Sequence, residues 1–111
     1  MHRICFLLHV RPDRLDEYRT AHEAVWPEML EALKATGWND YSLFLEEETG
    51  LVVGVLDTVD FEAAQAAMAA TDVDAKWQAS MAPYFAETDS PVTALPRVFH
   101  LETQLAALAT P

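Results

Sequence analysis

The chain has 111 residues, enough for one domain with a single modest core. Its 51% hydrophobic and 23% charged residues are ordinary for a soluble globular protein. Its 18 acidic residues outnumber 7 basic ones, and the resulting net charge of −11 repels phosphate backbones and anionic membranes. Nucleic acid and membrane surfaces are therefore not expected as partners, whereas a neutral, hydroxylated small molecule is a suitable ligand.

Several further classes lack support in the sequence. Cys5 is the single cysteine, so no intrachain disulfide can form. No secretory signal pattern and no apolar run long enough to span a bilayer is present, so a cytoplasmic location is expected. A glycine-rich phosphate loop and a Cys/His cluster at ligand spacing are also lacking, so we expect neither a cofactor nor a metal.

The first half of the chain predicts a strand, a long helix and a hairpin. Residues 3–10 (RICFLLHV) form a short apolar run that favours a buried strand. An amphipathic helix is expected from Arg14 to about Thr36, with a kink where Pro27 interrupts it near its middle. Residues 40–46 alternate between apolar and polar, and a turn joins them to a second buried strand at residues 51–57.

The second half predicts two helices and a last strand. An alanine-rich helix begins at Asp60, and a second helical segment runs from Thr71 toward Pro83. Turn residues follow at Asp89–Pro91. Residues 97–102 (RVFHLE) are expected to form the last strand, and residues 103–111 a tail of weak helical character.

The order β-α-β-β-α-β is that of a ferredoxin-like α+β domain, here spanning residues 1–111. Helices would cover one face of a four-stranded antiparallel sheet. The nearly continuous apolar runs at residues 4–8 and 51–56 indicate that both faces are covered. In so short a chain, a second copy is the simplest cover, and we expect a homodimer whose sheets face each other.

Tyr18, His22 and Trp26 are spaced four residues apart, which on one helix would align a phenol, an imidazole and an indole. Imidazole exchanges protons near neutral pH, and the aromatic rings suit a ligand that is partly apolar and partly hydroxylated. The same spacing also places His22 in an apolar arc beside Val25 and Met29, where a packed core histidine is common. Both interpretations are open at this point.

Four blocks identify a family. The segments EYRTAHEAVWPEM, NDYSLFLE and TDVDAKWQASM and the ending SPV…VFHL follow one another in the chain. Together they resemble the L-rhamnose mutarotases, small enzymes of the dimeric α+β barrel type, and the similarity runs from RICFLLHVRP to PRVFHL. The resemblance implies a similar fold and homodimer.

The resemblance also implies site residues. His22 corresponds to the proton donor of the family, and Tyr18, Tyr41 and Trp77 to residues that contact the sugar. The family usually carries two adjacent tryptophans where we align Lys76 and Trp77, so Lys76 is expected in the sugar-binding wall and bears on the choice of substrate. Trp26, on the strip of His22, is a further candidate for sugar binding.

The implied reaction is mutarotation of a 6-deoxy aldose, L-rhamnose foremost, by acid–base ring opening. One group must deliver a proton to the ring oxygen while the anomeric hydroxyl loses one, and a histidine can serve in both directions. A tyrosine, a carboxylate or water could handle the second proton. The alternatives are a mutarotase for L-fucose or another aldose, a cofactor-free monooxygenase of the same barrel architecture, and a non-catalytic ligand-binding dimer.

Overall fold

Three antiparallel strands form the sheet in a computed structural model that describes residues 1–85, 92 and 94–109. The strands are β1 (His2–His9), β2 (Asn39–Glu46) and β3 (Leu51–Thr58), in the order β1-β3-β2. Their positions agree with the predicted ones to within a residue or so. The α+β class expected from the sequence is confirmed.

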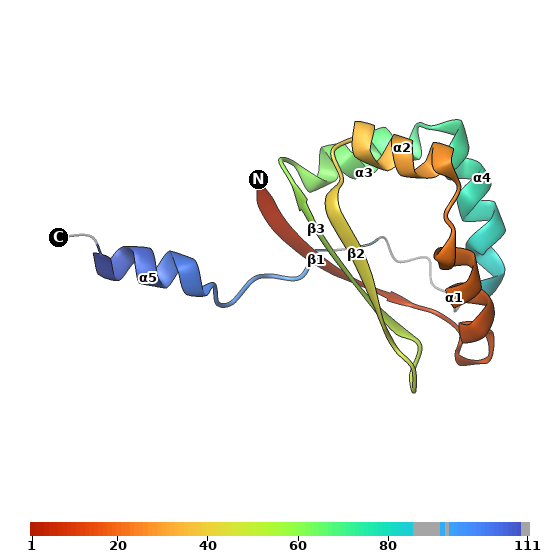
Figure 1. Cartoon of the computed structure of the whole chain (residues 1–111), viewed down its shortest axis with the longest axis horizontal. Coiled ribbons are helices and arrows are strands. Elements are labelled where there is room, and N and C mark those ends of the chain that lie inside the picture. The colour runs from red at the N-terminus through yellow and green to blue at the C-terminus, as the bar shows by residue number, and fades with distance from the viewer. Residues whose placement is uncertain (86–91, 93, 110–111) are drawn as a thin grey trace.

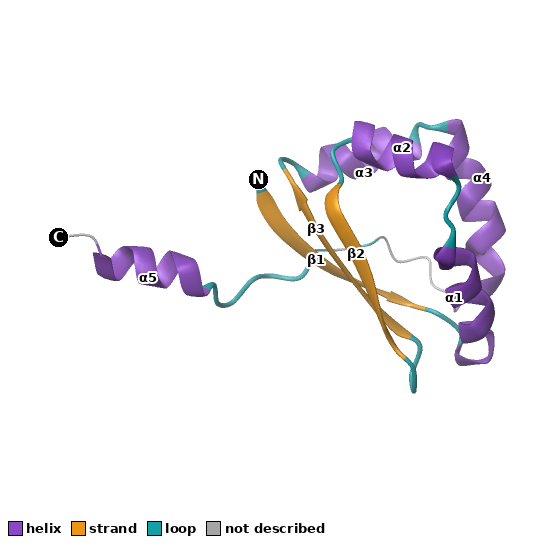
Figure 2. Cartoon of the chain, viewed as in Figure 1, coloured by secondary structure: helices purple, strands orange, loops and turns teal. Residues whose placement is uncertain are grey.

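Helices lie along one side of this sheet and leave the other side open (Figures 1 and 2). Trp77 and three methionines form the core between the helices, while Val10, Tyr18 and Val52 form a second cluster against the strands. Short 3₁₀ turns lie at Pro12–Arg14 and Ala82–Tyr84. The helices in the described residues are α1 (Leu15–Glu23), α2 (Pro27–Ala35), α3 (Phe61–Ala69), α4 (Asp72–Met81) and α5 (Leu101–Ala109).

The single long helix predicted for residues 14–36 is wrong in its continuity, because the chain forms two helices there. α1 ends at Glu23 and Pro27 opens α2 in its first turn. Proline lacks the N–H that a helix interior needs, but at a first helical position that N–H would have no partner in the helix anyway. The prediction of an interruption at Pro27 was correct, and Trp26 lies in the break rather than on the strip of His22.

The N-terminal caps of α3 and α4 lie where the sequence predicted them. The Asp60 carboxylate accepts a hydrogen bond from the Ala63 N–H at 3.1 Å, and the Thr71 hydroxyl accepts one from the Asp74 N–H at 3.2 Å. Gly37, with φ of +98°, ends α2 in a left-handed conformation that glycine adopts without steric cost. These caps fix where α3 and α4 begin and how β2 leaves α2.

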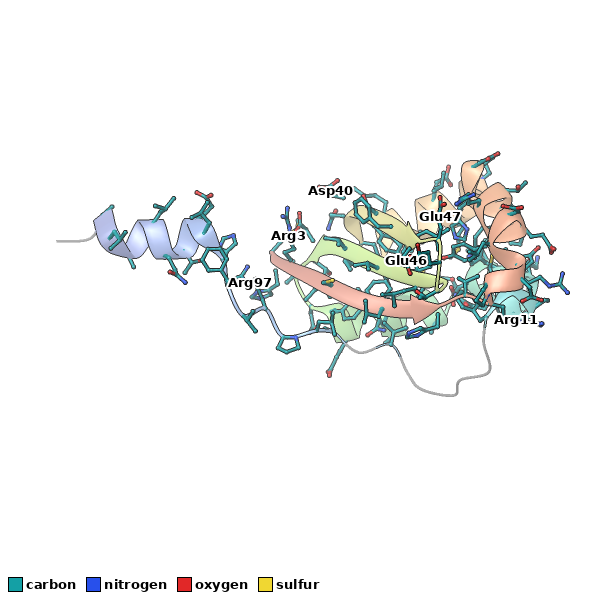
Figure 3. The ribbon with its side chains drawn as sticks, turned by 90° about the horizontal axis from the view of Figure 1, so that it is seen from below. Arg3, Arg11, Asp40, Glu46, Glu47 and Arg97 are labelled. Carbon is teal, nitrogen blue, oxygen red and sulfur yellow. The ribbon has the colours of Figure 1, made fainter. Side chains whose placement is uncertain are left out.

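The hairpin between β2 and β3 carries an acidic run. The Glu46 carboxylate accepts hydrogen bonds from the Glu48 and Thr49 N–H groups at 2.9 and 3.0 Å. Figure 3 shows Glu46 and Glu47 together on this hairpin, in the direction of α1. The run closes the turn, and Glu47 forms an ion pair with Arg19 of α1.

The strand predicted at residues 97–102 is wrong. The chain touches the free edge of β1 only briefly, with Ala94 opposite Phe6 and the Leu95 N–H donating to the Cys5 carbonyl at 2.7 Å. Pro96 follows and has no N–H to continue the ladder. The next residues are exposed and without regular structure, and Val98 is 93% exposed. The turn predicted at residues 89–91 lies outside the described residues.

The predicted weakly helical tail is helix α5, which points away from the sheet (Figure 1). His100 precedes it, and its ring Nδ1 accepts a hydrogen bond from the Thr103 N–H at 3.3 Å. Leu101, Leu105 and Leu108 are between 50% and 83% exposed. None of the helices that the structure describes is long and apolar enough to cross a membrane.

Candidate active site

A cavity of about 480 Å³ lies between the sheet and helices α1 to α4, a size typical of small-molecule sites. Its wall is mainly apolar and aromatic. Six polar side chains interrupt that wall, and they come from α1, β2, α3 and α4: Tyr18, His22, Tyr41, Gln65, Asp74 and Gln78.

His22 lies in the last turn of α1 and is half-buried. Its Nδ1 is 2.9 Å from the backbone carbonyl oxygen of Tyr18. Because a carbonyl only accepts hydrogen bonds, Nδ1 carries the hydrogen in the neutral ring and Nε2 is the nitrogen that gains and loses a proton. The ring lies between Tyr18, with ring centres 4.3 Å apart, and Trp77, which meets it edge-on at 5.4 Å. His22 thus lines a cavity with a fixed orientation.

Two phenols line the same cavity. Tyr18 is 4% exposed, and this burial raises its pKa to about 12. Burial raises the pKa of Tyr41 still further, and a charge on Tyr18 would add to that shift. Both side chains are therefore uncharged at neutral pH, and their O–H groups are available as hydrogen-bond donors.

The ring of Phe6, on β1, supports the position of Tyr41 in the cavity wall. The Phe6 ring packs against Tyr41, with ring centres 6.0 Å apart, and it stacks on Phe61 at 5.8 Å. Gly54 on β3 makes room for that ring, because a Cβ there would lie 2.3 Å from the Phe6 Cζ. A glycine in the middle of a strand thus supports the position of a cavity residue.

Trp77 forms the α4 side of the cavity and is 7% exposed. Trp26 meets its ring edge-on with centres 5.0 Å apart. Trp26 is 36% exposed and is not among the lining residues, so it supports Trp77 from outside the cavity. Lys76 is exposed and does not line the cavity either.

Of the six residues proposed from the sequence, the structure brings Tyr18, His22, Tyr41 and Trp77 together around one cavity. It places Trp26 and Lys76 outside. The sequence reasoning missed two polar residues of α4, Asp74 and Gln78, which line the cavity four residues apart, with Trp77 three residues after Asp74. The positions 74, 77, 78 and 81 follow the i, i+3, i+4, i+7 pattern of one helix face, and this signal could have found them.

The site is equipped for proton transfer to a small ligand. His22 supplies an imidazole, Tyr18 and Tyr41 supply phenols that can donate hydrogen bonds, and Asp74 supplies a carboxylate. Across the described parts of the chain, no group of three or more His, Cys, Asp and Glu side chains is arranged to hold a metal ion. An aromatic wall with few polar groups suits a ligand that has both apolar C–H surface and hydroxyls.

Comparisons with known proteins point in the same direction. Residues 3–101 match the family model of L-rhamnose mutarotase. The chain is 42% identical to the L-rhamnose mutarotase of Burkholderia cenocepacia (strain HI2424) over 106 residues, which cover 92% of this chain and all of that protein. It is also 42% identical to the L-rhamnose mutarotase of Bacillus subtilis (strain 168) over 105 residues, with the same coverage of each.

Solved structures agree on the fold. The crystal structure of an L-rhamnose mutarotase from Formosa agariphila superposes with a TM-score of 0.75 at 25% identity, covering 90% of this chain and 98% of that one. An antibiotic biosynthesis monooxygenase has a TM-score of 0.60 at 18% identity, covering 88% and 99% of the two chains. At 18% identity, the similarity to the monooxygenase shows a shared fold alone.

Proposed function

We propose that this chain, which belongs to the L-rhamnose mutarotase family, interconverts the α and β anomers of L-rhamnose by acid–base opening and reclosure of the sugar ring. The observation that carries the proposal is the cavity in which an oriented His22 lies between Tyr18 and Trp77. The comparisons show an isomerase of the mutarotase type.

In the proposed reaction the protonated His22 Nε2 delivers its proton to the ring oxygen while the bond from that oxygen to the anomeric carbon breaks. The anomeric hydroxyl passes its proton to a second group, a tyrosine, a carboxylate or water, and becomes the aldehyde oxygen. After the aldehyde group rotates, the hydroxyl formed from the former ring oxygen attacks its other face and returns its proton to His22, while the second group returns its proton to the aldehyde oxygen. An imidazole suits both directions because it can act as an acid in one and as a base in the other.

The remaining cavity residues would hold the sugar for this step. The neutral phenols of Tyr18 and Tyr41 donate hydrogen bonds to sugar oxygens, since burial keeps them protonated. The Trp77 indole offers a flat face to the C–H surface and the 6-methyl group of the sugar. None of these contacts requires a charged or phosphorylated ligand, which agrees with the acidic composition of the chain.

The other functions considered from the sequence are not favoured. The monooxygenase alternative is supported by fold likeness below 25% identity, whereas the mutarotase family is supported by both family model and relatives. A non-catalytic binding dimer does not account for a titratable, oriented histidine in the cavity wall. The choice between L-rhamnose and L-fucose is a question for experiment.

Saturation-transfer NMR measures the exchange between α and β signals of a free sugar. We expect the protein to speed this exchange for L-rhamnose, more weakly for L-fucose, and least for aldoses with a hydroxymethyl group. A protein that binds L-rhamnose but leaves its exchange rate unchanged would contradict the proposed function. Exchange that is fastest with L-fucose would change the substrate and keep the reaction.

We further propose that the chain forms the homodimer expected from its sequence, with sheet facing sheet. Leu7, Val53 and Phe44 lie opposite one another across β1, β3 and β2, on the face away from the helices. Phe44 is 62% exposed there, and apolar sheet surface of this kind is usually covered. A structural neighbour with a TM-score of 0.58 is described as a dimeric ferredoxin-like protein.

Sedimentation tests the homodimer. The protein should sediment at about twice its chain mass of 12.4 kDa, and Phe44→Asp should shift it toward the monomer. Thr20→Asp, at an exposed α1 position, is the matched control and should leave the mass unchanged. A wild-type monomer with full activity would contradict the homodimer. The cytoplasmic location stays a prediction from the sequence.

A further inference from the structure

Two side chains of α4, Asp74 and Gln78, form a polar pair that lines the cavity, with Asp74 half-buried and Gln78 exposed. The Gln78 Nε2 donates a hydrogen bond to the Asp74 Oδ1 at 3.2 Å. Both residues line the cavity, one helical turn apart, and Trp77 lies on the same face of α4. The pair and His22 line the same cavity from two different elements, α4 and α1.

The pair has hydrogen-bonding capacity left over. An ionised carboxylate accepts at both oxygens, and among the described residues no side chain donates to the Asp74 Oδ2. Gln78 keeps its carbonyl oxygen as an acceptor and a second N–H as a donor. The pair therefore offers both acceptors and a donor at neighbouring points, which matches two adjacent hydroxyls of a sugar ring.

Asp74 also has a structural role that must be separated from binding. It lies in the first turn of α4, where a negative charge is favourable at the helix N-terminus, and its N–H donates to the cap Thr71. Asp72 lies in the same first turn, but it is exposed and does not line the cavity. Asp72 thus also places a negative charge at the N-terminus of α4, but it cannot contact a ligand in the cavity.

We infer that Asp74 and Gln78 bind neighbouring sugar hydroxyls and set the preference among 6-deoxy aldoses. The inference rests on the proposed function and deepens it. L-Rhamnose and L-fucose share the 6-methyl group and differ in the configuration of ring hydroxyls, so an indole face alone distinguishes them poorly. A fixed pair of acceptors and a donor distinguishes them by which hydroxyls it meets.

The test compares Asp74→Asn and Gln78→Leu with Asp72→Asn, using anomer-exchange rates over a range of L-rhamnose and L-fucose concentrations. Hydrogen bonds to a charged group contribute about 1.5–3 kcal/mol, so Asp74→Asn should raise KM for L-rhamnose about 10-fold or more with kcat changed only a few-fold. The rate ratio between L-rhamnose and L-fucose should move toward one in both variants. Asp72→Asn should change neither KM nor the ratio.

Other outcomes overturn the inference. Equal small effects of Asp74→Asn and Asp72→Asn would reduce Asp74 to its role at the helix end. A fall in kcat at unchanged KM would place Asp74 in proton transfer instead of binding. If circular dichroism shows that Asp74→Asn does not fold, Gln78→Leu still tests the inference. An unchanged preference between L-rhamnose and L-fucose in that variant would contradict a role of the pair in sugar choice.

A failure of the proposed function would look different. In that case the wild-type protein would not speed the exchange of any aldose, whatever the variants do. The pair would then be judged by equilibrium binding of L-rhamnose, followed through tryptophan fluorescence. Weaker binding in Asp74→Asn than in Asp72→Asn would still support the pair, and equal binding in both would contradict it.

Discussion

The cavity has two walls that differ in chemistry and in how they are built. The first wall comes from α1 and β2 and carries Tyr18, His22 and Tyr41, groups that titrate or donate hydrogen bonds. The second comes from α4 and carries Trp77 between Asp74 and Gln78, an aromatic face flanked by acceptors. In the proposed reaction, proton transfer belongs to the first wall and the choice between sugars to the second, so substitutions in one wall should alter one property more than the other.

The largest effect is expected from His22→Gln in the first wall. Glutamine keeps a polar side chain at this position but cannot gain or lose a proton near neutrality, so anomer exchange should slow by about 10²–10⁴-fold. Binding of L-rhamnose, measured by tryptophan fluorescence, should change little, because the second wall is intact. Wild-type exchange rates in a folded variant would remove His22 from the reaction, and a variant that unfolds would favour the packed-histidine interpretation.

A tryptophan of the second wall should matter mainly for stability and binding. Trp77 is 7% exposed in the core with three methionines, so Trp77→Ala should lower the free energy of unfolding by about 3–5 kcal/mol in urea titrations. Trp26→Ala is the control for losing an indole, because Trp26 is 36% exposed and outside the cavity, and it should cost clearly less. Equal losses of unfolding free energy in both variants would contradict the conclusion that Trp77 is the more deeply buried of the two tryptophans.

The phenols of the first wall predict a dependence of stability on high pH. Burial raises the Tyr18 pKa from 10.0 to about 12, so the unfolded chain loses this proton before the folded one does. The contribution of Tyr18 to stability is constant below pH 10 and falls as the pH rises toward 12. Between about pH 9 and about pH 11, the urea midpoint should fall further in the wild type than in Tyr18→Phe. Parallel curves would mean that the phenol is not desolvated.

Much of this arrangement is readable from the sequence, because local rules decide it. Alternation fixed β2, the caps at Asp60 and Thr71 fixed two helix starts, and Pro27 marked the interruption between α1 and α2. Tyr18 and His22 of the first wall were found for the same reason, since they are one helical turn apart, whereas Tyr41 was proposed from the family resemblance.

Features that depend on residues far apart in the sequence could not be predicted from local patterns. The RVFHLE segment has the composition of a strand, but whether an edge is available to it depends on the rest of the fold, and Pro96 ends the contact with β1. Trp26 fell outside the strip because the break at Pro27 turns α2 away from the line of α1. In the second wall, the resemblance to a family with two adjacent tryptophans favoured Lys76 beside Trp77, whereas a helix places residues three and four apart on one face.

The smallest effect follows from that last point and concerns Lys76. Asp74, Trp77, Gln78 and Met81 share the cavity face of α4, and at about 100° per residue Lys76 points to the opposite side of the helix. Lys76 is exposed and does not line the cavity. Lys76→Ala should therefore leave the exchange rates of L-rhamnose and L-fucose unchanged, while Gln78→Leu, on the same helix but lining the cavity, changes their ratio. Exchange rates measured side by side for both variants and both sugars provide the check. A shift in sugar preference in Lys76→Ala alone would mean that the lysine contacts the ligand. Lys76 would then belong to the second wall of the cavity and not to the solvent-facing side of α4.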